Sequence, residues 1–335
     1  MHNSIYNTEN YLEIAAGKIP RLSSFDINGR NPVVSTGTDP EDVWNYAGVQ
    51  TLMTVPAPLL VSSSAAANDD DQIITLDGLD DLWNRQVVEV TPNNQTAVIV
   101  PQGNRVDTYM ISLAALVAGP PADTVITQAS SGASMKVVGS DTTHNTIWGY
   151  ASGTFDLAGA MTDPSGTMNP AAPVPTAFTA CSFWMRVNWV YNSSPVADPL
   201  KGDLYIAEQD TLAAGVPTTP ARVHSKIDIG MEMTQNAHFS VPLKHQVYIM
   251  DGWGSVNNDA GYAKFGVYTR AFGKLFHNRI LTSATNDGSS YINITRKLPS
   301  VIGEKSDIKI SCVEVEADTT DVSAGFQIIL EDLRR

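Results

Sequence analysis

The stretch Asp307-Ile308-Lys309-Ile310-Ser311-Cys312 alternates between polar and apolar side chains at every position. Because successive side chains of a strand point to opposite faces of a sheet, this alternation predicts a β-strand with one buried face. A second segment, 325–330, places Phe326, Ile328 and Leu330 on one face, and an acidic turn, 317–321, separates the two segments. The sequence therefore predicts that the chain ends in a hairpin.

The same signal recurs from Thr51 onward. Short segments with a period of two residues, or brief apolar runs, alternate with turn residues such as Gly, Pro, Asn and Asp. No helical period extends over the roughly 10–15 residues that a helix between parallel strands would need. The pattern favours an all-β chain of antiparallel β-sandwich or jelly-roll domains. Candidate strands are 72–76, 86–90, 96–100, 107–113, 124–127, 134–138, 182–190, 203–207, 226–229, 239–241, 246–250, 264–270 and 291–295.

The first fifty residues follow a different pattern. Segments 7–17 and 39–48 each begin with a capping residue and end at Gly, which predicts two short helices. In the second of them, Pro40 occupies the first helical position. The chain between these helices lacks periodicity, so we predict a mostly extended N-terminal arm that docks on a neighbouring subunit or another protein. The alternative is that this arm folds back onto the chain's own first sandwich. The candidate docking residues of the arm are Phe25, Arg30, Trp44 and Tyr46.

The predicted domain boundaries rest on the length of the chain and on one stretch without a strand pattern. At 335 residues the chain can form two domains that each bury a core. The stretch from Leu157 to Pro175 is rich in Pro, Ala, Gly and Thr and has no strand pattern. We therefore predict a docking arm at 1–50, a first β-sandwich region at 51–156, a loop or linker at 157–178, and a second β-sandwich or jelly-roll region at 179–335.

Charge and apolar patterning bear on the partners of the chain. It has 35 acidic and 21 basic residues, a net charge of −14, and no dense run of Lys and Arg. Such a chain repels a phosphate backbone, so nucleic acid is not an expected direct partner. The longest apolar stretch, 110–118, is about half of the roughly 20 residues that cross a bilayer. The first residues lack the basic and apolar regions of a secretory signal. Neither a membrane nor export is expected.

The sequence contains no standard catalytic signature. Phosphate-binding Gly-rich loops, zinc-binding helices, Cys-x-x-Cys pairs and the Gly-x-Ser-x-Gly elbow are all absent. Cys181 and Cys312 suit a reducing cytoplasm and are expected to be free and buried, although a bridge between them stays open. We expect no enzymatic activity, no cofactor and no metal.

Three weaker alternatives remain. The three histidines His224, His238 and His245 would bind a metal if their strands were adjacent. The acidic runs 68–71 and 77–81 contain ligands that suit calcium, without the spacing of an EF-hand loop. Carboxylates from different strands would allow glycoside hydrolysis if the fold paired them.

The aromatic segment 183–191 has two interpretations. Alternation places Phe183, Met185 and Trp189 on one face, which predicts core packing. Trp184 and Arg186 fall on the other face and suit an intersubunit contact, or a sugar if the aromatic side chains are exposed.

Several segments resemble virion structural proteins of tailed bacteriophages. The most specific block is Phe25–Pro32 followed by Thr36–Thr38 and Pro40–Trp44, and shorter matches are 74–80, 233–242 and 306–310. The chain departs from the family in its long Pro/Ala loop and around Asn93–Thr96.

The resemblance implies a virion component without catalytic residues, made in the cytoplasm of a bacterial host. Within that class it is most similar to a capsid decoration, or cement, protein that binds the major capsid protein as a symmetric homo-oligomer, with a trimer as the expected state. A tail, baseplate or fibre-attachment protein is the alternative within the virion. A carbohydrate-binding or carbohydrate-active β-sandwich protein is the alternative from another class.

Overall fold

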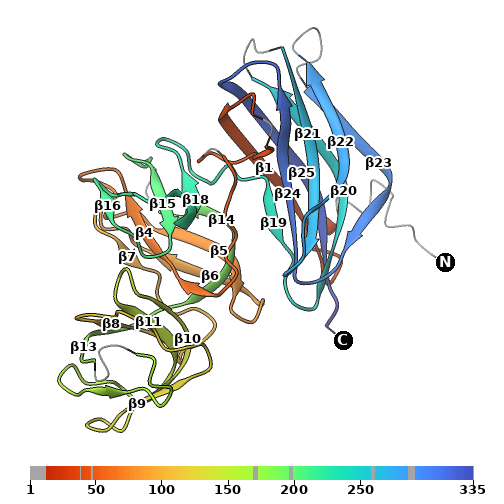
Figure 1. Ribbon diagram of the computed structural model, residues 1–335. Coiled ribbons are helices and arrows are strands. Elements are labelled where there is room, and N and C mark those ends of the chain that lie inside the picture. The colour runs from red at the N-terminus through yellow and green to blue at the C-terminus, as the bar shows by residue number, and fades with distance from the viewer. Residues whose placement is uncertain are drawn as a thin grey trace. The chain divides into compact units, whose positions relative to one another are not determined.

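The computed structural model describes residues 13–334 apart from positions 38, 47, 169–172, 196–198, 258–260 and 286–290. The described chain is all-β, with strands β1 to β25 in several antiparallel sheets. Its helical content is one turn at 13–15 and one 3-10 turn, η1, at Pro220–Arg222. The chain divides into two compact units (Figure 1). Unit 1 comprises residues 1–50 and 234–335, and unit 2 comprises residues 51–233, so unit 2 is an insertion in the sequence of unit 1.

Unit 1 consists of two antiparallel sheets. The first has the order β1 (Leu22–Val34), β25 (Thr320–Asp332), β20 (His245–Val256), β23 (Tyr291–Ile302). The second has the order β19 (His238–Ser240), β24 (Ser306–Val315), β21 (Tyr262–Ala271), β22 (His277–Thr285), and β2 (Glu41–Asp42) also pairs with β24.

The two sheets of unit 1 pack through apolar side chains. Phe25 of β1 stacks on Phe239 of β19 with their ring centroids 6.3 Å apart. A Cβ atom on Gly254 of β20 would lie 2.7 Å from the ring of Phe265 in β21, so only glycine leaves room for that ring. On the outer face of the first sheet, Ile14 covers Ile329 and Met250.

The N-terminal segment from residue 13 onward is part of unit 1 and not a free arm. Strand β1 pairs with β25 from Leu22 opposite Glu331 to Val34 opposite Thr320. A Cβ atom on Gly29 would lie 2.2 Å from the carbonyl oxygen of Val43, so the chain at 42–44 crosses β1 at close range. The prediction of a separate extended arm is thus wrong for the described residues, because this segment pairs with β25 and buries Ile27 and Val34 in unit 1. The alternative is correct in that the segment folds back onto its own chain, but it folds onto residues 234–335 and not onto the predicted first sandwich at 51–156.

Two further predictions for unit 1 are corrected. The second predicted helix, 39–48, is an irregular segment that contains β2, because pairing of Glu41 and Asp42 with Cys312 and Ser311 satisfies this backbone. The first predicted helix is reduced to the turn at 13–15, and residues 7–12 lie outside the described residues. The predicted C-terminal hairpin is also wrong. Strands β24 and β25 form as expected, but they belong to different sheets, so the turn between them crosses the sandwich.

Unit 2 contains a sandwich of two four-stranded sheets around one apolar core. The first sheet is β3 (Ala57–Pro58), β14 (Phe183–Asn192), β5 (Ile74–Asp80), β6 (Arg85–Val90). The second is β18 (Val223–Ile227), β15 (Leu204–Ala207), β4 (Leu60–Ser63), β7 (Val98–Ile99). A small hairpin, β16 (Leu212–Ala213) and β17 (Val216–Pro217), follows β15.

A six-stranded sheet lies between β7 and β14 in the sequence of unit 2. Its order is β12 (Met161–Thr162), β9 (Val125–Gln128), β10 (Ser134–Asp141), β11 (Thr146–Ser152), β8 (Thr108–Leu113), β13 (Pro175–Ala180). The sheet has its own core, which includes Phe155, Met161 and Met168. The predicted linker at 157–178 therefore belongs to a packed region, because its two methionines fill that core and its ends pair as β12 and β13. The observed division into 51–233 and the remainder replaces the predicted boundaries at 156 and 178.

Candidate functional site

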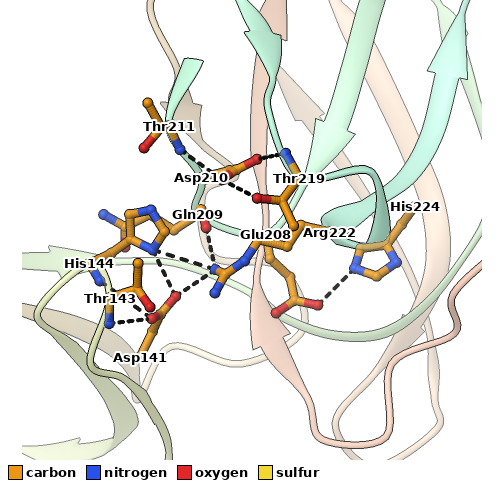
Figure 2. A network of polar contacts seen from close by, with 10 residues as sticks. All are labelled: Asp141, Thr143, His144, Glu208, Gln209, Asp210, Thr211, Thr219, Arg222 and His224. Carbon is orange, nitrogen blue, oxygen red and sulfur yellow. Dashed lines mark hydrogen bonds and ion pairs between the residues drawn. The ribbon is translucent and has the colours of Figure 1, made fainter. Parts of the chain in front are cut away.

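A polar network drawn from separate elements lies in unit 2, between the six-stranded sheet and the β18–β15–β4–β7 sheet (Figure 2). Asp141 ends β10, and His144 lies in the turn before β11. Glu208 follows β15, Arg222 ends η1 and His224 lies in β18. The network therefore joins two sheets that are separate in sequence.

Asp141 is the centre of this network. Its Oδ2 atom lies 2.5 Å from Nη1 of Arg222 and 2.9 Å from Nδ1 of His144. Burial raises the pKa of Asp141, but the hydrogen bonds from Arg222 and His144 outweigh burial, and the net pKa is lowered. Burial likewise lowers the pKa of Arg222, and its bond to Asp141 reverses the sign. Arg222 also donates to the carbonyl oxygen of Gln209, so its guanidinium has partners in two segments of the chain.

His224 forms the second half of the network. Its side chain is buried, with Nε2 3.0 Å from Oε1 of Glu208 and Nδ1 3.1 Å from the carbonyl oxygen of Thr51. Both ring nitrogens thus face oxygen acceptors, which fixes the ring orientation. Asp210 accepts hydrogen bonds from the backbone and the hydroxyl of Thr219, which closes the segment that carries β16 and β17.

The cavity beside this network is too small for a substrate. It measures about 10 Å³ and is lined by Asp141, Glu208 and Arg222 together with apolar side chains such as Trp148. This volume suffices for one water molecule at most. Two more contacts join the six-stranded sheet to chain segments next to β5 and β3, in the other sheet of the sandwich: Tyr150 donates to Asp81, and Nε1 of Trp148 donates to the carbonyl oxygen of Pro56 at 2.8 Å. These contacts of Asp141, Arg222, Trp148 and Tyr150 hold the six-stranded sheet on the sandwich, and we call them the clasp.

The docking residues predicted from the sequence are divided between the two units. Phe25, Arg30, Trp44 and Tyr46 lie in unit 1, whereas Trp184 and Arg186 lie in unit 2. Of the first group, Trp44 is buried against Tyr46, with ring centroids 5.5 Å apart, and Phe25 is half-buried. Arg30 is exposed and pairs with Asp321 at 2.6 Å.

Trp184 and Arg186 are buried inside unit 2. Trp184 is 0% and Arg186 1% exposed. The Arg186 guanidinium lies 5.1 Å from the ring of Trp83 and donates to the carbonyl oxygens of Met53 and Met185. Burial of this order leaves neither side chain available to a partner or a sugar. Both faces of β14 are therefore covered over residues 183–188, and Trp83 and Met53 lie against the Arg186 side chain, whereas Trp189 is half-buried.

The metal hypotheses find no converging ligands in the described part of the chain. His224 lies in unit 2, while His238 and His245 lie in unit 1. Asp69, in the first acidic run, is buried and accepts hydrogen bonds from Ser63 and from the backbone of residues 201 and 202. Within the described residues, no group of three or more His, Cys, Asp or Glu side chains is placed to hold a metal ion.

A buried triad-like cluster in unit 1 is also structural. Ser240 donates to Oδ1 of Asp307 at 2.6 Å and lies 3.1 Å from Nε2 of His238. The same His238 nitrogen is 3.9 Å from Asp307, so the carboxylate does not orient the opposite ring nitrogen as a nucleophilic triad requires. The serine is 0% exposed.

One group of residues was missed by sequence reasoning. Arg270, Lys274, His277 and Arg279 line a pocket of about 280 Å³ in unit 1. A signal existed, because eight of the 21 Lys and Arg residues lie between positions 264 and 309. They are spaced along strands and turns, so they form no dense run in the sequence.

The cysteines follow the simpler expectation: Cys181 and Cys312 are free and buried. Burial raises the pKa of both thiols, that of Cys312 to about 12, so neither is a nucleophile at neutral pH. No helix in the described part of the chain has the length and apolar character needed to span a membrane.

No protein-family model and no curated protein matches the chain. Among solved structures, the chain has weak similarity to those of infectious bursal disease virus. The structure of its Gt strain gives a TM-score of 0.17 at 9% identity, over 94% of this chain and 74% of that chain. The crystal structure of the VP2 subviral particle gives a TM-score of 0.15 at 9% identity, over 94% and 73%. The Gx strain gives 0.17 at 8%, over 93% and 72%. Similarity this low carries no argument about fold or function.

Proposed function

We propose that the chain is a non-enzymatic structural component of a tailed-phage particle. The specific role proposed is that of a capsid decoration protein, which binds the major capsid protein on the outer shell as a symmetric homo-oligomer. The observation that carries this proposal is the strand order of unit 1, β1-β25-β20-β23 in one sheet and β19-β24-β21-β22 in the other.

This strand order supports a jelly roll. Apart from β2, unit 1 has eight strands in two four-stranded sheets, and its first strand, β1, lies beside its last, β25. From β19 onward the chain passes repeatedly from one sheet to the other, as in two interlocked Greek keys. Unit 2 enters between the first and second of these eight strands. Jelly rolls occur in capsid domains and also in lectins and cupins, so the fold alone does not choose among them.

The side chains support a structural role over catalysis. The clasp in unit 2 uses its charged groups internally and leaves room for one water molecule. The triad-like cluster of unit 1 is buried. The aromatic residues Trp184 and Trp44, which would have suggested sugar or partner binding, are core residues.

The charge distribution supports assembly through unit 1. Unit 2 has 18 acidic and 7 basic residues, whereas unit 1 has 17 and 14. Copies packed through unit 2 would repel one another, but the nearly neutral unit 1 allows close contact between copies or with a shell. An acidic unit 2 also suits a face turned away from packaged DNA.

Mass spectrometry of purified particles tests this proposal, after heads and tails have been separated. We expect peptides of both units in the head fraction, at a copy number that follows the shell symmetry. Absence from particles would overturn the proposal, and presence in the tail fraction alone would assign the chain to the tail or baseplate. Binding to a glycan array by a chain absent from particles would favour the carbohydrate-binding alternative.

A further inference from the structure

The basic pocket of unit 1 is unusual in a chain of net charge −14. It lies where the turn between β21 and β22 meets the turn between β23 and β24. Arg270, Lys274, His277 and Arg279 line it, and none of the described lining residues is an acid. Its volume of about 280 Å³ falls just below the roughly 300–1,000 Å³ of small-ligand pockets. It is large enough to take side chains of a protein segment.

Contacts within unit 1 fix two of the basic side chains that line the pocket. Asp307 is 0% exposed, and its Oδ2 atom accepts a hydrogen bond from Nε of Arg270 at 2.8 Å. The Arg270 guanidinium also lies 4.3 Å from the ring centroid of Phe276. Nε of Arg279 donates to Oγ1 of Thr269 at 2.9 Å. Two of the four basic groups therefore have fixed orientations before any ligand arrives, which lowers the entropic cost of binding.

The rim of the pocket suits a protein segment better than a free anion. Val301, which lines the pocket, is 56% exposed, and Leu275, which follows the lining residue Lys274 in the sequence, is 82% exposed. An apolar edge next to basic groups is typical of a protein interface. The expected occupant is thus a short acidic segment with small apolar neighbours.

Unit 2 presents such a segment, the acidic turn 66–71. In this turn Ala66, Ala67, Asp70 and Asp71 are exposed. Asp69 anchors it, because its carboxylate accepts a hydrogen bond from Ser63 at 2.6 Å and its backbone N–H donates to Asn94. The two adjacent carboxylates are therefore displayed on a fixed turn.

We propose that the acidic turn 66–71 of one copy binds the basic pocket of a second copy, with Asp70 and Asp71 facing Lys274 and Arg279. This inference rests on the proposed function, since it supplies the contact between copies. The contact is head-to-tail, joining different surfaces of the two partners, and such contacts close into rings when the rotation between copies allows. Each exposed ion pair contributes little, so stability comes from several pairs and from ring closure.

Light scattering of the full chain, over a concentration series at low salt, tests the contact. The wild-type chain should self-associate and dissociate as salt shortens the Debye length to a few ångströms. The pocket variant Lys274→Glu/Arg279→Glu and the turn variant Asp70→Lys/Asp71→Lys should each weaken association by at least about tenfold. An equimolar mixture of the two variants should associate again, because the reversed charges are complementary.

The control matched to the pocket variant is Lys18→Glu/Lys136→Glu. It makes the net charge more negative by the same amount as the pocket variant does, at exposed sites outside the pocket. It should associate as the wild type does. Circular dichroism should show that every variant is folded, since all substituted side chains are exposed.

Four outcomes would overturn the inference: a monomeric wild type at low salt, a pocket variant that associates normally, a control that weakens equally, or a mixture that stays monomeric. If the pocket variant self-associates normally but no longer binds inorganic phosphate, the pocket is an anion-binding site instead. If the chain is found in particles while the contact fails, the proposed function stands and this inference does not.

Discussion

At the scale of single residues, each unit contains one carboxylate that links separate segments of its own chain. Asp307 joins Ser240 of β19 to Arg270 of β21 inside unit 1. Asp141 joins Arg222 to the six-stranded sheet inside unit 2. Asp307 is fully buried and Asp141 is half-buried, and each is stabilised by an arginine, so each is costly to remove without removing its partner.

Substitution Asp307→Asn should destabilise unit 1. The amide keeps the size of the side chain but leaves the Arg270 charge, whose side chain is 21% exposed, without its counter-ion. We expect a loss of about 3 kcal/mol in the free energy of unfolding. Urea unfolding, followed by labelling of the buried Cys312 thiol, measures it. Asp26→Asn makes the same change on an exposed side chain and should leave unit 1 unaffected; equal effects of both substitutions would contradict the role of Asp307.

The lowered pKa of Asp141 implies that unit 2 loses stability in acid. Its folded pKa is depressed, so its contribution is present above the unfolded pKa of about 4 and is lost as pH falls through the lower folded value. Substitution Asp141→Asn should destabilise unit 2 above about pH 4, and by progressively less as the pH falls below that value. Thermal unfolding of both proteins across this range measures the difference. A gap that widens on acidification would contradict the assignment.

At the scale of elements, β1 is the strand on which unit 1 depends. It pairs with β25 along almost its whole length and contributes the buried side chains Ile27 and Val34 to the core. It also covers one edge of β25, which would otherwise expose a long row of backbone donors and acceptors. The N-terminal segment from Leu22 is thus a structural strand of the unit 1 sandwich.

Removal of residues 1–34 should prevent folding of unit 1. The buried side chains of β1 are worth about 1.5–3 kcal/mol each, and with the lost pairing their sum approaches the roughly 5–15 kcal/mol stability of a domain. We expect the Cys312 thiol to react at once while the Cys181 thiol of unit 2 stays protected. A truncated chain with both thiols protected would show that β1 is dispensable.

The success of sequence reasoning varied between elements for physical reasons. Strand β24 was predicted because alternation of Ile308, Ile310 and Cys312 is a local signal of one buried face. The strands that pair with β24 could not be predicted, because a turn such as 317–321 has similar residues whether it closes a hairpin or crosses from one sheet of a sandwich to the other. Segment 39–48 has good helix caps, yet pairing with β24 outweighs caps on a helix of so few residues. The clasp and the basic pocket escaped prediction because their residues converge only through non-local strand pairing.

At the scale of the whole molecule, unit 2 is an insertion whose two ends are held close together by unit 1. The backbone N–H of Gln50 donates to Asp42, next to β24. Asn236 forms a bridge with Trp44, and the backbone of Ala237 donates to Val43. Positions 50 and 234 therefore leave unit 1 from neighbouring backbone segments. Unit 2 has two apolar cores of its own and does not depend on residues of unit 1 for them.

Replacement of residues 51–233 by a short Gly/Ser linker should leave unit 1 folded. A flexible linker of about six residues has a mean span of roughly 13 Å, which suits neighbouring chain ends. We expect a compact all-β protein by circular dichroism, a protected Cys312 thiol and loss of most of the net negative charge. Residues 51–233 alone should fold with a protected Cys181 thiol, as the complementary control. If unit 1 carries the shell contact, the shortened chain should also enter particles, whereas residues 51–233 alone should not. A shortened chain that folds but is excluded from particles would place the shell contact in unit 2.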